Sequence, residues 1–271
     1  GYGFSSAITA LLGNAFGKKK YKLATIYAHK GLIFVPLIGV ILSLIGYFFA
    51  PSLFILLGAK EDYLNLSLEY INPILFGSVF FMFNFSLNSI LVATGDTKTY
   101  RNSLIFGFFA NLVLNPLLMY GFLFIPAMGL SGIAIATVLI QIINMGYLLY
   151  KVLQTKLIHF EKLDYFSPNF KVYKQFLNQG IPSSLNMLTM GIGSLILTYF
   201  VSHYGVNAVA GYGIGFRVEQ LMLLPALGLS TAVLALVSNN YGAKRYDRVI
   251  ETMKVSLKYG FIIATVGIIF L

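Results

Sequence analysis

The chain has 271 residues and a formal net charge of +10; 58% of its residues are hydrophobic, only 10% are charged, and the mean hydropathy is +0.80. Soluble domains carry about 25% charged residues, so this composition excludes a disordered chain, a nucleic-acid-binding domain and an ordinary cytosolic enzyme, and predicts an integral membrane protein. The absence of cysteine excludes disulfides and thiolate nucleophiles, and the scatter of the three histidines argues against a metal site.

Eight apolar segments are predicted membrane helices, since about 20 apolar residues cross a ~30 Å hydrocarbon core. In chain order they span residues 1–16, 31–58, 63–93, 103–124, 126–150, 175–201, 206–241 and 255–271, the first and last being partial. A β-barrel would alternate apolar and polar residues, which these segments do not do. Pro182 is expected in the first turn of its segment. Because both ends of the chain lie inside apolar segments, we expect it to be a piece of a longer protein.

Basic residues alternate between successive connections. Counting the start of the last segment, 17 of the 19 Lys and Arg residues fall on one side, in the connections at 17–30, 94–102, 151–174 and 242–254. The positive-inside rule places that side in the cytoplasm of a multi-pass protein of the prokaryotic plasma membrane. The basicity is thus explained by topology and membrane lipids, and it requires no nucleic-acid partner.

An internal repeat relates the two ends of the chain. Residues 10–21, ALLGNAFGKKKY, align with residues 235–246, ALVSNNYGAKRY, at an offset of 225. Both copies end an apolar segment on the cytoplasmic side, six segments apart, which is the layout of transporters built from two parallel six-helix units. Gly17 and Gly242 follow these helix ends, and we expect both to form left-handed C-caps.

Four stretches carry a resemblance to a transporter family. They are GLSTA at 228–232 running into NNYGA at 239–243, ATGDTKT at 93–99, GLSGIAIAT at 129–137, and GIPSS at 180–184. In this order the sequence resembles the multidrug and toxic compound extrusion (MATE) family of secondary transporters over essentially its whole length, and the DinF-like branch in particular. The resemblance implies twelve helices, of which this chain would run from within helix 2 to within helix 9.

The expected fold class is therefore all-α, a polytopic membrane bundle of two pseudo-symmetric six-helix lobes, both truncated here. We expect residues 1–153 to form the N-lobe, residues 154–174 a cytoplasmic linker, and residues 175–271 part of the C-lobe. A monomer is expected.

Polar side chains within the N-lobe segments are the first candidate site. Asn111 and Asn115 share a helix face, Pro116 frees a backbone carbonyl near them, and Thr137 stands on the next, antiparallel segment. Oxygen ligands suit a hard cation, and the resemblance implies that these residues contribute to an N-lobe cation site. The DinF-like branch commonly has Asp at the position of Asn115, and a neutral amide cannot titrate. The alternative is that the asparagines only form hydrogen bonds between helices.

A second group lies in the later segments. Another branch of the family carries a Glu where this chain has Met190, so we expect no Glu-based cation site on this helix, and Met190 is a candidate for lining the cavity. Arg217 and Glu219 point about 200° apart on one helix, so each needs its own partner or a water-filled cavity. They are either wall residues of a substrate cavity or braces between helices. Asn84 and Asn88 share a face near the cytoplasmic side, where we expect a hydrogen bond between helices.

The sequence therefore predicts a secondary active antiporter, not an enzyme. It would export organic, mainly cationic, drugs or toxic compounds as the lobes rock about a central cavity, with Na⁺ or H⁺ as coupling ion and no other cofactor. One alternative is a lipid-linked saccharide flippase of similar fold, which would need a strongly cationic cavity. The other is a non-transporting membrane scaffold, which would tolerate changes at Asn111, Asn115 and Arg217.

Overall fold

The computed structural model describes residues 1–122, 126–158 and 167–270, which form eight α-helices. The helices are α1 (Tyr2–Gly17), α2 (Tyr21–Leu56), α3 (Glu61–Ala93), α4 (Lys98–Tyr120), α5 (Gly129–Gln154), α6 (Phe170–Ser202), α7 (Val206–Gly242) and α8 (Tyr246–Phe270). Within the described part, six of them, α2 to α7, are long and apolar enough to cross a membrane. The predicted all-α membrane bundle is confirmed.

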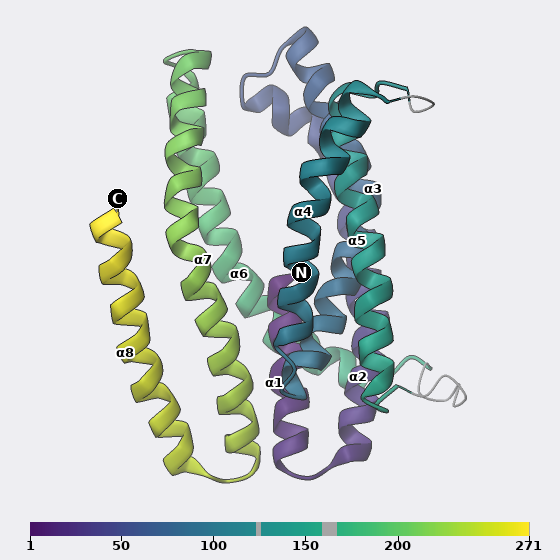
Figure 1. Cartoon of the computed structure of the whole chain (residues 1–271), viewed down its shortest axis with the longest axis vertical. Helices are drawn as coiled ribbons and strands as arrows, with labels where there is room; N and C mark the ends of the chain where they lie inside the picture. The colour runs from purple at the N-terminus through teal and green to yellow at the C-terminus, as the bar shows by residue number, and fades with distance from the viewer. Residues whose placement is uncertain (123–125, 159–166, 271) are drawn as a thin grey trace.

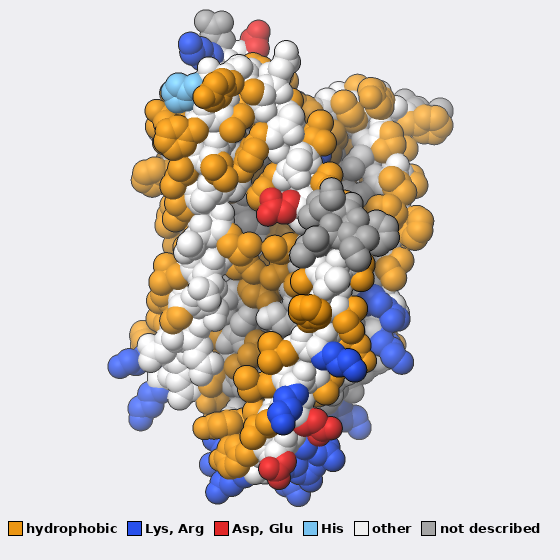
Figure 2. Space-filling view, turned by 90° about the vertical axis from the view of Figure 1, so that its left-hand side faces the viewer, with side chains coloured by type: hydrophobic (Ala, Val, Ile, Leu, Met, Phe, Trp, Pro, Cys, Tyr) orange, Lys and Arg blue, Asp and Glu red, His pale blue; other side chains and the backbone are white. Residues whose placement is uncertain are grey.

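The helices form two groups, with α1 to α5 on one side and α7 and α8 on the other, and α6 passes from the first group to the second (Figure 1). The turns between α1 and α2 and between α7 and α8 lie at the same end of the molecule, and the turn between α6 and α7 lies at the opposite end (Figure 1). Lys and Arg side chains gather at the first end, below a broad band of hydrophobic side chains (Figure 2). The arrangement agrees with the predicted topology.

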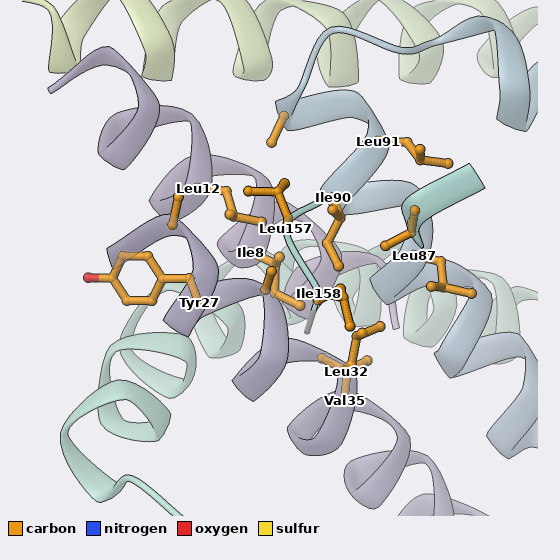
Figure 3. Close-up of a cluster of buried hydrophobic side chains, with 14 of the residues drawn as sticks. Ile8, Leu12, Tyr27, Leu32, Val35, Leu87, Ile90, Leu91, Leu157 and Ile158 are labelled. Carbon is orange, nitrogen blue, oxygen red and sulfur yellow. The ribbon is translucent and has the colours of Figure 1, made fainter. Parts of the chain in front are cut away.

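The buried core surrounds α1 where it meets α2 and α3 (Figure 3). The side chains with less than 2% exposure in this cluster include Ile8, Leu12, Val35, Leu87, Ile90 and Leu91. Because lipid tails are as apolar as these side chains, helix association in a membrane depends on close packing and hydrogen bonds rather than on the removal of apolar surface from water. The burial of these side chains around α1 therefore indicates close packing between helices, and not apolar surface removed from water.

Helix α6 begins at Phe170, earlier than the predicted start at residue 175. The Asn169 side chain accepts hydrogen bonds from the backbone amides of Lys171 and Val172, at 3.1 and 3.3 Å, and so caps the first turn. Val172 is buried against the core of the first helix group. Pro182 consequently lies inside the helix. The prediction that it occupies the first turn is wrong.

Helices α2 and α8 also begin earlier than predicted, at Tyr21 and Tyr246 rather than at residues 31 and 255. Their first turns each carry a basic residue of the cytoplasmic side, Lys22 in α2 and Arg248 in α8. Lys and Arg are good helix formers, and their long side chains reach water while the backbone stays hydrogen-bonded. A hydropathy window therefore begins too late, because it measures the membrane-embedded length and not the helix.

The cytoplasmic ends of α1 and α7 are two copies of one structure. In both, the backbone turns at a lysine in the left-handed region, Lys19 with φ 56° and Lys244 with φ 59°. The amides of the next residues, Lys20 and Arg245, each donate to the carbonyl five residues earlier, at 2.9 Å in both cases. The sequence repeat is therefore also a repeat of backbone structure.

Gly17 and Gly242 do not form the left-handed caps predicted for them. Both lie within their helices, and the two helices cross so closely that neither position has room for a side chain. A β-carbon at Gly17 would lie 2.7 Å from the backbone nitrogen of Ala243, and one at Gly242 would lie 3.0 Å from the α-carbon of Asn14. These glycines are required by the contact between helices rather than by backbone conformation.

The turn between α3 and α4 is held by Asp96. One carboxylate oxygen accepts from the backbone amides of Lys98 and Thr99, both at 3.0 Å, and the other accepts from the Thr99 hydroxyl at 2.5 Å. Burial raises the pKa of Asp96, but these hydrogen bonds and the positive charge of Lys151 outweigh burial and hold the pKa below its ordinary value. Asp96 thus stabilises the start of α4 in its charged form.

Replacing Asp96 with alanine removes this acceptor, and we expect the free energy of unfolding to fall by about 1 kcal/mol. Because its pKa is lower in the folded chain, the contribution is fully present above the unfolded pKa of about 3.9 and is lost as the pH falls through the folded pKa. Unfolding of the purified protein in detergent, followed by circular dichroism over this pH range, measures both effects.

The control for this test is Asp96→Asn, which keeps an acceptor for the two amides but cannot titrate. It should cost less stability than Asp96→Ala at neutral pH and should remove the pH-dependent part. Equal unfolding midpoints for Asp96→Ala and the unmodified protein would contradict the assigned role.

Candidate functional site

A cavity of about 1040 Å³ lies between α1, α2, α6 and α7. Its walls come from the first turn of α1 and from the middle of the other three helices, so it lies at membrane depth where the two helix groups face each other. Most of the wall is apolar, and its side chains include Phe4, Ile38, Met187, Met190, Phe216 and Leu223. A cavity of this size can hold a drug-sized molecule.

Few polar groups reach this cavity. Glu219 and Gln220 contribute from α7, and Ser184 and Ser194 contribute from α6. Among the described residues that line the cavity, Glu219 is the one acidic residue, and none is basic. The Oγ atom of Ser184 is buried without a hydrogen-bond partner. An acidic side chain on an otherwise apolar wall is a feature that can select for a cationic ligand.

The structure places Glu219 and Met190 on the cavity wall and Arg217 outside it. Arg217 stands two residues before Glu219, and the helical rotation of about 200° between them turns its side chain away. Gln220 and Ser184 were not singled out from the sequence. The signal available was their polarity within long apolar segments, which by itself does not show which face of a helix meets a cavity.

Asn111, Asn115 and Thr137 lie away from the cavity, at the contact of α4 with α5. A β-carbon at Gly132 would lie 2.5 Å from the Leu118 carbonyl oxygen, and one at Gly107 would lie 3.2 Å from an Ile140 methyl carbon. The antiparallel register defined by these two contacts sets Thr137 at about the level of Asn111 on the facing helix.

The hydrogen bonds of this group leave its oxygens available. The Asn111 amide donates to the carbonyl of Gly107 at 3.0 Å, and the Thr137 hydroxyl donates to the carbonyl of Ile133 at 3.0 Å. The Oδ1 atom of Asn115 is buried with no hydrogen-bond partner among the described residues. A neutral set of oxygen atoms can bind a hard monovalent cation, but no member of it can exchange a proton near neutral pH.

A second polar contact joins α3 to α5. The amide nitrogen of Asn84 donates to the backbone carbonyl of Gln141 at 2.9 Å and to its side-chain oxygen at 2.7 Å. Asn84 is only 4% exposed. The sequence predicted a hydrogen bond between helices for Asn84, but its partner Gln141 follows only from the packing of the two helices.

Comparison with known proteins decides the family. The sequence profile of the MatE family matches residues 1–117 and 182–271. The chain belongs to the MatE family. It is 30% identical over 270 residues to the "Probable multidrug resistance protein YoeA" of Bacillus subtilis, covering 98% of this chain and 58% of that protein. The DinF-like branch within the family stays a prediction.

Two solved structures, each described as a conformation of a multidrug resistance MATE family transporter of the MOP superfamily, match nearly all of this MatE chain. An outward-facing structure has a TM-score of 0.82 at 25% identity and covers 99% of this chain and 60% of that one. An inward-facing structure has a TM-score of 0.75 at 26% identity and covers 99% of this chain and 61% of that one. The chain thus spans about three-fifths of these proteins, and its helices fit the outward-facing arrangement more closely.

The Asn84–Gln141 contact yields a prediction on stability. Replacing Asn84 with alanine leaves the Gln141 side chain without its donor, and a double-mutant cycle with Gln141→Ala should give a coupling energy of about 0.6 to 1.7 kcal/mol. Unfolding of the four proteins in detergent measures it. Asn102→Ala, at an exposed position, serves as the control and should change stability little. Strictly additive effects of the two substitutions would show that the contact is not formed.

Proposed function

We propose that the protein containing this chain is a secondary active exporter of organic cations. The observation that carries the proposal is the position of Glu219, a lone carboxylate on the wall of an otherwise apolar cavity between the two helix groups. The family supports it, because transporter substrates bind near the bilayer midplane at the interface of the repeats. The name of the relative YoeA, a probable multidrug resistance protein, agrees with it.

Three features of the cavity favour a lipophilic cation. A cation about 4 Å from the Glu219 carboxylate gains roughly 4 kcal/mol at an effective dielectric constant of about 20. The rings of Phe4 and Phe216 offer cation–π surfaces, and the side chains of Met187 and Met190 adapt to different shapes. The flippase alternative would require basic residues for a pyrophosphate group, and the described lining contains no Lys or Arg.

The N-lobe group supports a proposal for the coupling ion. Its oxygens from Asn111, Asn115 and Thr137 are neutral, so they suit Na⁺ and cannot carry a proton at working pH. Na⁺ would drive export through a difference in its affinity for the outward- and inward-facing states, since equal affinity for both shifts nothing. Glu219 is the acidic residue among the described residues of the cavity wall.

Substitution of Glu219 tests the substrate class. We expect Glu219→Gln in the full-length protein to reduce uptake of a fluorescent organic cation by everted vesicles about tenfold, the equivalent of 1.4 kcal/mol of binding energy. Uptake of an uncharged dye of similar size should be unchanged. The control is Glu251→Gln, which alters an exposed carboxylate on α8. Full cation uptake by Glu219→Gln would remove the basis for this proposal.

Substitution of Asn115 tests the coupling ion. We expect Asn115→Ala to weaken uptake driven by a Na⁺ gradient, because it removes the unpartnered oxygen, and Asn115→Asp to add a response to a pH gradient, because it introduces a titratable group. The two gradients are imposed separately on vesicles, with Asn102→Ala as control. Uptake that is indifferent to both changes would reduce Asn115 to a structural amide. No uptake by the unmodified protein under either gradient would favour the flippase or the scaffold.

A further inference from the structure

A second cavity lies at the cytoplasmic turn between α1 and α2, and its volume is about 520 Å³. The residues that line it, which we call the basic pocket, are Lys19, Lys20, Tyr21, Lys22, Leu23 and Ile26. Three of the six are lysines, and this described lining contains no Asp or Glu. None of the six lines the large cavity between the helix groups. Three ammonium groups around one hollow favour an anionic ligand.

The backbone of the turn that carries the three lysines is well ordered by hydrogen bonds. The amides of residues 18, 19 and 20 donate to carbonyls in the last turn of α1 at 3.1, 2.8 and 2.9 Å. Residue Lys19 adopts the left-handed conformation that turns the chain into α2. A ligand that binds the lysines therefore orders only their side chains, because the backbone is already in place.

The basic pocket changes from charged to apolar in the direction of the membrane. Its lysines lie at the cytoplasmic end of α2, and Ile26 lies about 6 Å farther along the helix than Lys22. Leu23 and Ile26 are partly buried against the core. A phospholipid has the same order of groups, since its phosphate lies at the surface and its acyl chains lie below. A free phosphate ion would use the lysines but not the apolar part.

The second copy of the repeat provides an internal comparison. Tyr21 and Tyr246 are equivalent at the offset of 225, and each contacts an aromatic ring in the last turn of the preceding helix, with centroids 6.3 and 5.7 Å apart. The two tyrosines are similarly exposed, at 61% and 53%. The two turns are therefore matched in backbone and in aromatic packing.

The two turns differ in the residues that would meet a lipid. The position of Lys22 is Asp247 in the second copy, and that of Ile26 is Glu251. A carboxylate at each of these positions repels a phosphate, and Glu251 also removes the apolar wall. Both turns lie on the cytoplasmic side and both carry basic residues, so the positive-inside rule does not account for the difference between them.

We propose that the basic pocket is a binding site for one anionic phospholipid of the cytoplasmic leaflet, and that the equivalent surface of the second copy is not. The phosphodiester group would contact the three lysines, and one acyl chain would lie along Leu23 and Ile26. Basic pockets at the cytoplasmic ends of membrane helices suit such headgroups. The inference goes beyond the proposed transport function and does not depend on it.

Fluorescence quenching by brominated lipids tests the site. The chain contains no tryptophan, so Tyr21→Trp in the full-length protein, with any tryptophan outside this chain replaced, reports on the pocket. The protein is reconstituted in phosphatidylglycerol and phosphatidylcholine, with each lipid brominated in turn. We expect phosphatidylglycerol to be preferred about tenfold at Tyr21→Trp, and several times less at the matched probe Tyr246→Trp. Equal preferences at the two probes would overturn the proposal.

Two triple variants distinguish a site from diffuse attraction to a basic surface. One neutralises the pocket, by Lys19→Gln, Lys20→Gln and Lys22→Gln. The other removes as many charges from the second turn, by Lys244→Gln, Arg245→Gln and Arg248→Gln. We expect only the first to abolish the excess preference at Tyr21→Trp. An equal loss with both triple variants would show that surface charge alone attracts the lipid, and it would overturn the proposal.

A double variant tests the pocket with fewer charges removed. Lys22→Asp with Ile26→Glu gives the first turn the residues of the second, and it should lower the preference at Tyr21→Trp to that at Tyr246→Trp. A preference that survives this change would show that these two positions do not form the site.

Inorganic phosphate separates the two sources of a phosphate group. Added in excess at constant ionic strength, it should leave the preference for phosphatidylglycerol unchanged. Loss of the preference would assign the pocket to a soluble phosphate and overturn the lipid site. The measurement uses no transported substrate and no ion gradient. A lipid preference in a protein that does not transport would therefore refute the exporter alone, and transport without a lipid preference would refute this inference alone.

Discussion

Helix α1 has contacts of two different kinds on its two sides, and the rest of the bundle is arranged around that difference. Toward α2 and α3 it buries Ile8 and Leu12 completely and shares a serine pair with α3. Toward α7 it presents glycines to another backbone and forms no side-chain hydrogen bond in the described part of the chain. The first kind of contact fixes α1 within one group of helices. The second lets the backbones of α1 and α7 approach each other closely.

Several polar side chains at membrane depth also form their hydrogen bonds without joining the two helix groups. Hydroxyl and amide groups such as those of Thr137, Asn111 and Ser238 donate to carbonyls of their own helices, so the helices can shift without leaving a donor unpaired. Among the described residues, hydrogen bonds between helices either lie within the first group, as that of Asn84 with Gln141 does, or join it to α6, as that of Tyr27 with Gln175 does. In this part of the chain, contact of the first group with α7 and α8 is left to packing, which suits a protein whose two halves are proposed to move.

Under the proposed function, chemical selectivity would depend on very few atoms. Glu219 is the acidic residue among the described residues of the cavity wall, and the aromatic and methionine side chains around it can adapt to ligands of different shapes. The oxygens of the N-lobe group lie in a different part of the bundle, between α4 and α5. If substrate and coupling ion bind at these two places, they communicate only through the relative position of the helix groups, because no described residue belongs to both sites.

The sequence by itself determined the membrane class, the number and order of the helices, the orientation and the repeat, because hydropathy, loop charge and repeated motifs are local properties of the chain. It misjudged the starts of α2, α6 and α8, where helix continues beyond the apolar segment, and it assigned Gly17 and Gly242 to turns. Only the tertiary structure decided that these glycines hold two helices together, that Glu219 faces the cavity while Arg217 does not, and that Gln141 pairs with Asn84. Each of these depends on which helix faces lie opposite each other, and that follows from packing between segments far apart in the chain.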